Sequence, residues 1–171
     1  MIDGTMIREA TESDIPEMNA IYNQYIVGSH VSFDTEAWTD QKRLDWFVDR
    51  TSNGYPFFVA LSAGDVIGMS WSGPWRHKAA YRRSAETTVV LRPDVTGSGV
   101  GTVLYETLLE RLVELGFHRA YAIVALPNEP SVRLHLKLAF TELGVLDEAG
   151  FKDGSFVSTM LLERRLDQPS L

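Results

Sequence analysis

A strand, a glycine-rich turn and an apolar helix follow one another in the middle of this chain, and this unit constrains the fold most. Residues 85–91 are rich in β-branched side chains and end at Arg92-Pro93-Asp94, as a strand does. Residues 96–101 read Thr-Gly-Ser-Gly-Val-Gly. Leucines at helical spacing come next, at positions 104, 108, 109, 112 and 115. The unit predicts a strand that turns sharply into a buried helix.

The glycines of this turn suit an anionic ligand. Three glycines in six residues let the backbone curl, so that several N–H groups converge where the helix dipole is positive. A pyrophosphate is held in this way, but a plain strand-to-helix connection would use the same glycines. The dinucleotide pattern G-x-G-x-x-G is not matched, because Thr102 and Val103 follow Gly101. A Walker A loop is excluded here, since Gly-Lys-Ser/Thr is missing.

The rest of the chain mixes helices and strands. Apolar residues at helical spacing predict helices over residues 15–28, 39–52 and 131–138, the first of them started by Thr11-Glu12-Ser13-Asp14. In the second helix we expect Leu44, Phe47 and Val48 to point inward. Strands are predicted over residues 57–61, 66–71, 120–125, 141–146 and 155–162. This order indicates a mixed α/β fold in which helices cross one sheet.

Length and composition argue against several classes of protein. A chain of 171 residues without a shift in composition is expected to form one domain, residues 1–166, with a frayed tail over residues 167–171. The net charge of -7 argues against a nucleic-acid-binding surface. Neither a membrane-length apolar run nor a signal-peptide pattern is found, so we expect a cytoplasmic location without membrane contact. The lack of cysteine, and of metal-ligand spacing around His30, His77 and His118, argues against a metal site.

The glycine turn resembles the pyrophosphate loop of the Gcn5-related N-acetyltransferases, which reads Gln/Arg-x-x-Gly-x-Gly/Ala. Gly99 and Gly101 match the two closing positions, and Thr96 stands where Gln or Arg is usual. The resemblance implies the GNAT fold, with a mixed central sheet of about six or seven strands flanked by about four helices. It also implies acetyl-CoA as co-substrate. The residues expected to bind acetyl-CoA are Val89, Val90, Leu91, Thr96, Gly97, Ser98, Gly99, Val100, Gly101, Thr102, Asn128 and Ser131.

Blocks over nearly the whole chain are similar to the phosphinothricin and methionine sulfone N-acetyltransferases of that superfamily. They are residues 32–36, 73–75, 126–135 and 149–152, together with Tyr81 and Glu86. This branch implies transfer of acetyl to the α-amine of a small amino-acid-like substrate, by direct attack in a ternary complex. It also implies a homodimer, with substrate pockets near the interface. Phe156 stands where Trp is usual in this branch, and Ser158 where Asp is common, so the C-terminal part of the pocket is the least transferable.

Acetyl transfer to an amine needs a base, because such amines are mostly protonated at neutral pH. Glu86 is our candidate, since it opens an otherwise apolar strand where burial would raise its pKa; an exposed carboxylate at a strand end is the alternative. A backbone N–H of residues 89–91 could donate to the oxyanion. His135 is the candidate donor to the departing thiolate, against a plain buried helix histidine. Asn128 is expected to hydrogen-bond CoA or to form an Asx turn.

An amino-acid-like substrate needs a cation for its carboxylate and walls for its side chain. Arg76 and Lys78 are our candidate anion clamps, and two solvated loop charges are the alternative. Phe33 and Tyr81 are expected to form walls of the pocket, with Trp75 nearby, although plain core aromatics would look the same. Two other functions stay open. One is acetyl transfer to a different amine, and the other is a non-catalytic acyl-CoA-binding module.

Overall fold

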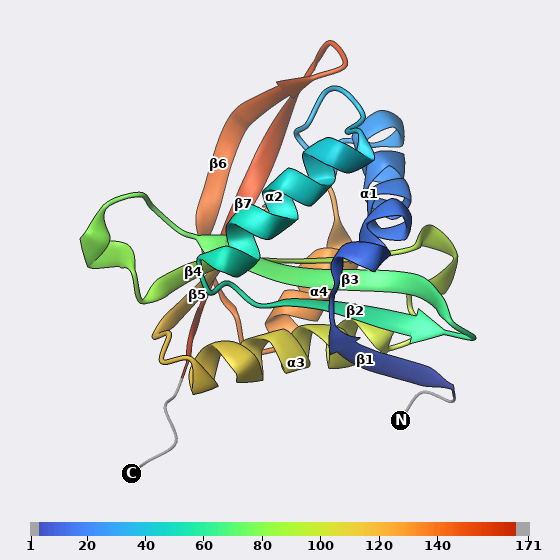
Figure 1. The fold of residues 1–171 in the computed structure, drawn as a ribbon. Coiled ribbons are helices and arrows are strands. Elements are labelled where there is room, and N and C mark those ends of the chain that lie inside the picture. The colour runs from blue at the N-terminus through green and yellow to red at the C-terminus, as the bar shows by residue number, and fades with distance from the viewer. Residues whose placement is uncertain (1–3, 167–171) are drawn as a thin grey trace.

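Seven strands form one mixed sheet in the computed structural model, which describes residues 4–166, and four helices pack on it (Figure 1). The strands are β1 Thr5–Glu9, β2 Phe57–Ser62, β3 Asp65–Pro74, β4 Ser84–Leu91, β5 Arg119–Ala125, β6 Thr141–Lys152 and β7 Ser155–Arg165, in the spatial order β1-β2-β3-β4-β5-β7-β6. The helices are α1 Ile15–Gly28, α2 Asp40–Ser52, α3 Val100–Glu114 and α4 Glu129–Lys137. The expected mixed α/β sheet with its four helices is confirmed. The expected tail, residues 167–171, lies outside the described residues.

Two apolar cores lie on opposite faces of this sheet. Helices α1 and α2 cover one face and α3 and α4 the other (Figure 1). Leu104, Leu108 and Leu112 of α3 are each 0% exposed, as their helical spacing predicted. The inward position expected for Val48 of α2 is wrong, since its side chain is 39% exposed. Arg43 is instead buried on that helix, where its guanidinium lies over aromatic rings.

The ends of the predicted helices and the first hairpin follow from local chemistry. Thr11 and Asp14 form a capping box on the short 3-10 helix Glu12–Asp14, which leads directly into α1. Thr39 caps α2 by accepting a hydrogen bond from the amide of Lys42. Ala63 and Gly64 both have positive φ, which makes the tight turn between β2 and β3. No helix within residues 4–166 is long and apolar enough to span a membrane.

Strands β4 and β5 run parallel but stay paired over a short distance only. Residues Ser84, Ala85 and Glu86 pair with Arg119, Ala120 and Tyr121, whereas on its other edge β4 pairs with β3 as far as Leu91. The two parallel strands therefore diverge after Glu86, in the middle of the sheet. This divergence leaves backbone of β4 free to face a cavity instead of a neighbouring strand.

The β6–β7 hairpin fixes the loop between α1 and α2. Lys152 of β6 is 4% exposed, and its Nζ donates to the carbonyl oxygens of Ile26 at 2.6 Å, Ser29 at 2.8 Å and Ser32 at 2.7 Å. The ring of Phe33 lies directly on Gly150, in space that a β-carbon at that position would need. The end of α1 and the following loop are thus held against β6 by a buried cation and a ring.

Candidate active site

The glycine turn between β4 and α3 depends on backbone conformations that favour glycine. Gly97 has a φ of 79° and Gly99 a φ of 89°, both in the left-handed region. Gly101 lies inside the first turn of α3, where a β-carbon would come within 3.2 Å of the Leu91 side chain. The three glycines are therefore required by the turn itself and by its close packing on β4.

Hydrogen bonds inside this turn leave its amides free. Thr96 donates from Oγ1 to a carbonyl oxygen of its own loop at 3.0 Å, and Ser98 does the same at 2.7 Å. Within the described part of the chain, no hydrogen bond engages the amides of Gly97, Ser98, Gly99 or Gly101. Free amides at a helix start form an anion-binding site. The side chain of Thr96, however, faces its own loop.

A lysine that the sequence analysis missed lies beside this turn. Lys137, in the last turn of α4, donates from Nζ to Thr102 Oγ1 at 3.4 Å. Residue 137 is distant in sequence from the turn, so only the packing of α4 against the start of α3 brings the ammonium there. The amide of Thr102, by contrast, donates to Gly99 at 3.0 Å and is engaged within the helix start.

A narrow cavity of about 70 Å³ opens where β4 and β5 diverge. Among the predicted cofactor-binding residues, Val89, Val90, Asn128 and Ser131 line it, and so does His135. Leu91 does not line this cavity, and its carbonyl oxygen accepts a hydrogen bond from Tyr25 at 2.7 Å. The remaining lining residues are Tyr22, Tyr25, Val31, Ser32, Thr87, Thr88, Ala122, Ile123, Val124 and Ala125. We refer to this space as the strand cavity.

Asn128 and Ser131 form the start of α4 at one end of the strand cavity. The Asn128 side-chain oxygen accepts from the Ser131 amide at 3.2 Å and so caps the helix. This contact comes from the amide three residues on, so it is a helix cap and not the Asx turn that we named as the alternative. Asn128 also lines the cavity.

His135 is buried, and both of its ring nitrogens are engaged. Nδ1 lies 2.7 Å from the Ser131 carbonyl oxygen and must carry a proton to donate there; Nε2 lies 3.2 Å from the Tyr105 hydroxyl. That hydroxyl lies 2.7 Å from Thr87 Oγ1, which donates to the Tyr121 carbonyl oxygen at 3.0 Å. Burial lowers the pKa of His135 below its usual value. A polar chain thus links α4 to β4 next to Glu86.

Glu86 lies where the parallel pairing ends. It faces Gly73 of β3 on one side and Tyr121 of β5 on the other. Its side chain is partly buried. The alternative, an exposed carboxylate at the end of a strand, is therefore wrong. Burial raises the pKa of Glu86, and the positive charge of Arg50 opposes that rise.

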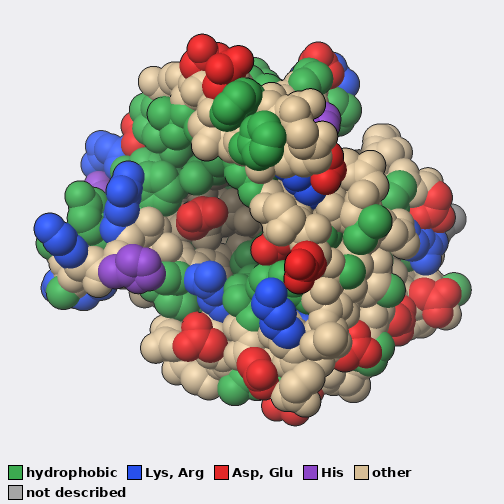
Figure 2. Space-filling model, turned by 90° about the horizontal axis from the view of Figure 1, so that it is seen from above, with side chains coloured by type: hydrophobic (Ala, Val, Ile, Leu, Met, Phe, Trp, Pro, Cys, Tyr) green, Lys and Arg blue, Asp and Glu red, His purple; other side chains and the backbone are tan. Residues whose placement is uncertain are grey.

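A second cavity, of about 320 Å³, lies between the end of α2 and the loop that joins β3 to β4. It brings together the predicted residues Arg76, Lys78 and Tyr81, and adds Arg50, His77 and Arg82. Figure 2, seen from the top of Figure 1, shows this side of the molecule hollowed, with Lys, Arg and His side chains along one rim. We call this space the basic cavity. Its other lining residues are Asp49, Asn53, Tyr55, Pro74 and Ala79.

The two remaining predicted aromatics, Phe33 and Trp75, are not among the residues that line the basic cavity. Trp75 stacks on Tyr121 with ring centroids 4.3 Å apart, and the Arg76 guanidinium lies 5.1 Å from the Trp75 ring. Phe33 packs on Gly150 of β6, while its neighbours Val31 and Ser32 line the strand cavity. Within residues 4–166, no three His, Cys, Asp or Glu side chains are grouped to hold a metal ion.

A glycine turn with free amides, a cavity between diverging strands and a partly buried carboxylate at their branch point define a class of acyl-transferring enzymes. Residues 18–140 match the model of the acetyltransferase (GNAT) family. The chain belongs to this family.

Individual relatives show which branch of the family this chain resembles. A phosphinothricin N-acetyltransferase from Streptomyces coelicolor is 37% identical over 163 residues, covering 94% of this chain and 95% of the relative. An L-methionine sulfoximine/L-methionine sulfone acetyltransferase from Pseudomonas aeruginosa is 34% identical, covering 94% of each chain. A phosphinothricin acetyltransferase of Sinorhizobium meliloti, solved in complex with AcCoA, superposes with a TM-score of 0.92 at 28% identity, covering 98% of this chain and 94% of that one. The resemblance to this branch is thereby confirmed.

Proposed function

We propose that this protein transfers the acetyl group of acetyl-CoA to the α-amine of a small amino-acid-like acceptor, by direct attack in a ternary complex. The observation that carries the proposal is the location of Glu86. Its cross-strand neighbour Gly73 lies under Arg50, which lines the basic cavity, and the next residue, Thr87, lines the strand cavity. A base at this point can serve an amine that enters from one cavity and an acyl donor held in the other.

Acetyl-CoA fits the residues of the glycine turn and the strand cavity. The free amides of Gly97, Ser98, Gly99 and Gly101 would hold the pyrophosphate. Lys137 would add a positive charge, which Thr96 cannot supply at a position where Gln or Arg is usual. Acetyl-CoA supplies an acetyl thioester, whose acyl carbon is open to attack by an amine. The remaining residues that we assign to its binding are Val89, Val90, Leu91, Val100, Thr102, Asn128 and Ser131.

Glu86 and His135 are assigned the proton transfers. Glu86, with its pKa raised by burial, takes the proton from the amine so that the nitrogen lone pair is free. His135 lines the strand cavity, and its Nδ1 proton is already donated to the Ser131 carbonyl oxygen. We therefore assign the imidazolium form of His135 as the proton donor to the departing thiolate, a step that returns the ring to neutral imidazole. Burial lowers the pKa of His135, which makes this imidazolium a stronger acid.

The basic cavity is assigned to the acceptor. Arg76 and Lys78 supply positive charge for its anionic groups, and Tyr81 supplies an aromatic wall with a hydroxyl. Phe33 and Trp75 stay assigned as outer aromatic contacts. The named substrates of the relatives, phosphinothricin, methionine sulfoximine and methionine sulfone, are amino acids with a polar side-chain group, which suits a cavity with several cations.

A thiol-release assay tests the reaction and the base together. Wild type, Glu86→Gln and the control Glu106→Gln, an exposed carboxylate of α3, are assayed with acetyl-CoA and each of these three amino acids. We expect turnover by wild type and the control, and a loss of roughly a hundredfold or more in Glu86→Gln. Activity only on other amines would mean a different acceptor. Binding of acetyl-CoA without turnover on any amine would mean a non-catalytic acyl-CoA-binding module.

We also propose a cytoplasmic homodimer in which residues 1–166 act as one acetyltransferase domain. The β6–β7 hairpin supports the dimer, because large apolar side chains are exposed along it, namely Leu143, Val145, Leu146, Phe151 and Phe156. Analytical ultracentrifugation at micromolar concentration tests the assembly. A monomer under those conditions would contradict it.

A further inference from the structure

Arg50 of α2 is a partly buried cation whose Nε has no hydrogen-bond partner. Its Nε is buried and has no hydrogen-bond acceptor among residues 4–166, and Arg50 takes part in no ion pair within that range. A buried nitrogen donor without an acceptor costs free energy, so an anion that reached this nitrogen would be stabilised there. An aromatic contact, 5.7 Å from the guanidinium to the Trp46 ring, does not replace that anion.

Gly73 makes the room for this guanidinium. The Nη1 and Cζ atoms of Arg50 occupy the space that a β-carbon at Gly73 would take. Gly73 is also the cross-strand partner of Glu86 in the β3–β4 register. The bare backbone at Gly73 therefore lets a cation from α2 approach the branch point of the sheet.

The basic cavity opens onto this cation. Arg50 lines it together with Arg76, Lys78 and Arg82, while Asp49 is the one carboxylate among its lining residues. Arg76, Lys78 and Arg82 are exposed, whereas Arg50 is partly buried. Arg50 is also the cation whose charge acts on Glu86. The cavity thus has an outer set of exposed cations and an inner one close to the base.

The chemistry of an α-amino acid decides between these cations. Its amine and its carboxylate are attached to the same carbon, so a carboxylate-binding cation must lie close to the base that receives the amine proton. The exposed cations of the loop suit instead a polar group at the far end of the acceptor side chain. Resting on the proposed function, we propose that Arg50 binds the α-carboxylate of the acceptor and so presents the α-amine to Glu86.

A comparison of carboxylate and carboxamide acceptors tests this role. Wild type, Arg50→Gln, Arg50→Lys and the control Lys42→Gln, on the same helix but lining neither cavity, are assayed with methionine sulfone and its α-carboxamide. We expect wild type and control to prefer the carboxylate acceptor over the carboxamide. In Arg50→Gln, the ratio of the two kcat/KM values should fall about tenfold or more. Arg50→Lys should keep part of the preference. The KM for acetyl-CoA should be unchanged in all variants.

Gly73→Ala provides a second variant that keeps the charge of Arg50 but takes its space. We expect the same loss of carboxylate preference, with the protein folded as judged by its unfolding transition and by its KM for acetyl-CoA. If Arg50→Gln keeps the wild-type preference and only its pH profile moves, Arg50 acts on Glu86 alone and the proposal is overturned. Wild type that acetylates neither acceptor would overturn the proposed function itself, which is a separate outcome.

Discussion

At the scale of single residues, burial shifts the two proposed proton-transfer groups in opposite directions. It raises the pKa of Glu86 and lowers that of His135, because burial disfavours the charged form of each. Glu86 thus becomes a stronger base than a free carboxylate, and protonated His135 becomes a stronger acid than a free imidazolium. The positive charge of Arg50 opposes the rise of the Glu86 pKa.

A pH profile tests the state of Glu86. The carboxylate is the active form, so log kcat/KM is expected to rise with pH through a pKa above the ordinary carboxyl value of 4.5. This limb should be missing in the residual activity of Glu86→Gln. The measurement is steady-state thiol release at saturating acetyl-CoA across pH 4.5 to 9. An unchanged acidic limb in Glu86→Gln would assign it to another group.

Lys152 gives a second test at this scale. Replacement by Met leaves the carbonyl oxygens of Ile26, Ser29 and Ser32 without their donor, which is expected to cost about 3 kcal/mol of unfolding free energy. The control Lys42→Met, at an exposed lysine over Trp38, should cost less than about 1 kcal/mol. Urea unfolding measures both. Equal costs for the two variants would show that the buried contacts of Lys152 contribute little.

At the scale of elements, the glycine turn between β4 and α3 needs its glycines both for its backbone conformation and for its free amides. Positive φ at Gly97 and Gly99 shapes the turn, and the free amides that result face the start of α3. The narrow strand cavity lies between β4 and β5, where the two strands diverge. In the proposed function, the glycine turn would hold the phosphate end of acetyl-CoA and the strand cavity its acyl end.

Substitutions at two glycines that flank α3 distinguish backbone strain from an effect on ligand binding. Gly99 at its start and Gly116 just past its end have φ of 89° and 81°, so Ala at either position is strained by about 1 kcal/mol. Gly99→Ala should also raise the KM for acetyl-CoA roughly tenfold, because the free amides move. Gly116→Ala should leave that KM unchanged. Thermal unfolding and initial rates provide the comparison, and equal KM values would contradict our assignment of the turn.

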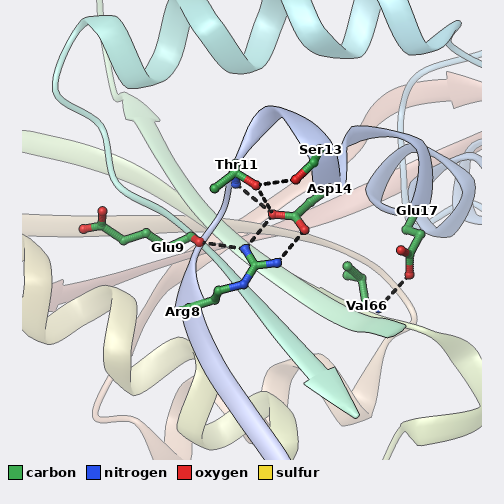
Figure 3. Close-up of polar contacts among 7 residues, drawn as sticks. All are labelled: Arg8, Glu9, Thr11, Ser13, Asp14, Glu17 and Val66. Atoms are coloured by element: carbon green, nitrogen blue, oxygen red, sulfur yellow. Dashed lines mark hydrogen bonds and ion pairs between the residues drawn. The ribbon is translucent and has the colours of Figure 1, made fainter. Parts of the chain in front are cut away.

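At the scale of the whole molecule, a polar corner ties the start of α1 to strands β1 and β3 (Figure 3). Arg8 of β1 donates two hydrogen bonds of 2.7 Å to the Asp14 carboxylate, which also accepts from the Thr11 amide at 2.8 Å. One turn further along, Glu17 accepts from the amide of Val66 in β3 at 2.7 Å. Strand β1 and the start of α1 are therefore coupled through a nearly buried carboxylate.

This corner predicts how stability depends on pH. Hydrogen bonds from Arg8 hold the pKa of Asp14 below 3.8, so its stabilising contribution is complete above that value and is lost as pH falls further. Asp14→Asn is expected to cost about 2 kcal/mol at pH 7 and less at pH 3. Glu86, with its raised pKa, acts in the opposite sense and favours the folded state at low pH. Urea unfolding at both pH values tests this, and a cost for Asp14→Asn independent of pH would contradict it.

The sequence alone determined the local parts of this protein. Capping residues and apolar spacing marked the helices, and β-branched runs marked the strands. The glycines predicted a sharp turn into α3 that could hold an anion, since its conformation depends on residues next to one another. Glu86 could also be found from the sequence, as a carboxylate in an otherwise apolar strand.

Only the tertiary structure decided which distant residues meet. Arg50 reaches Gly73, Lys137 reaches the turn at Thr102, and Lys152 reaches the end of α1. In helix α2 the apolar pattern pointed Val48 inward, but the packing buries Arg43 instead, among aromatic rings from other elements. Local spacing cannot contain such contacts, because their partners are brought together by the order of the strands and the packing of helices on the sheet. The local pattern defined the helices, the strands and the resemblance of the glycine turn to a pyrophosphate loop. The fold decided which charged side chains surround Glu86, where β4 and β5 diverge.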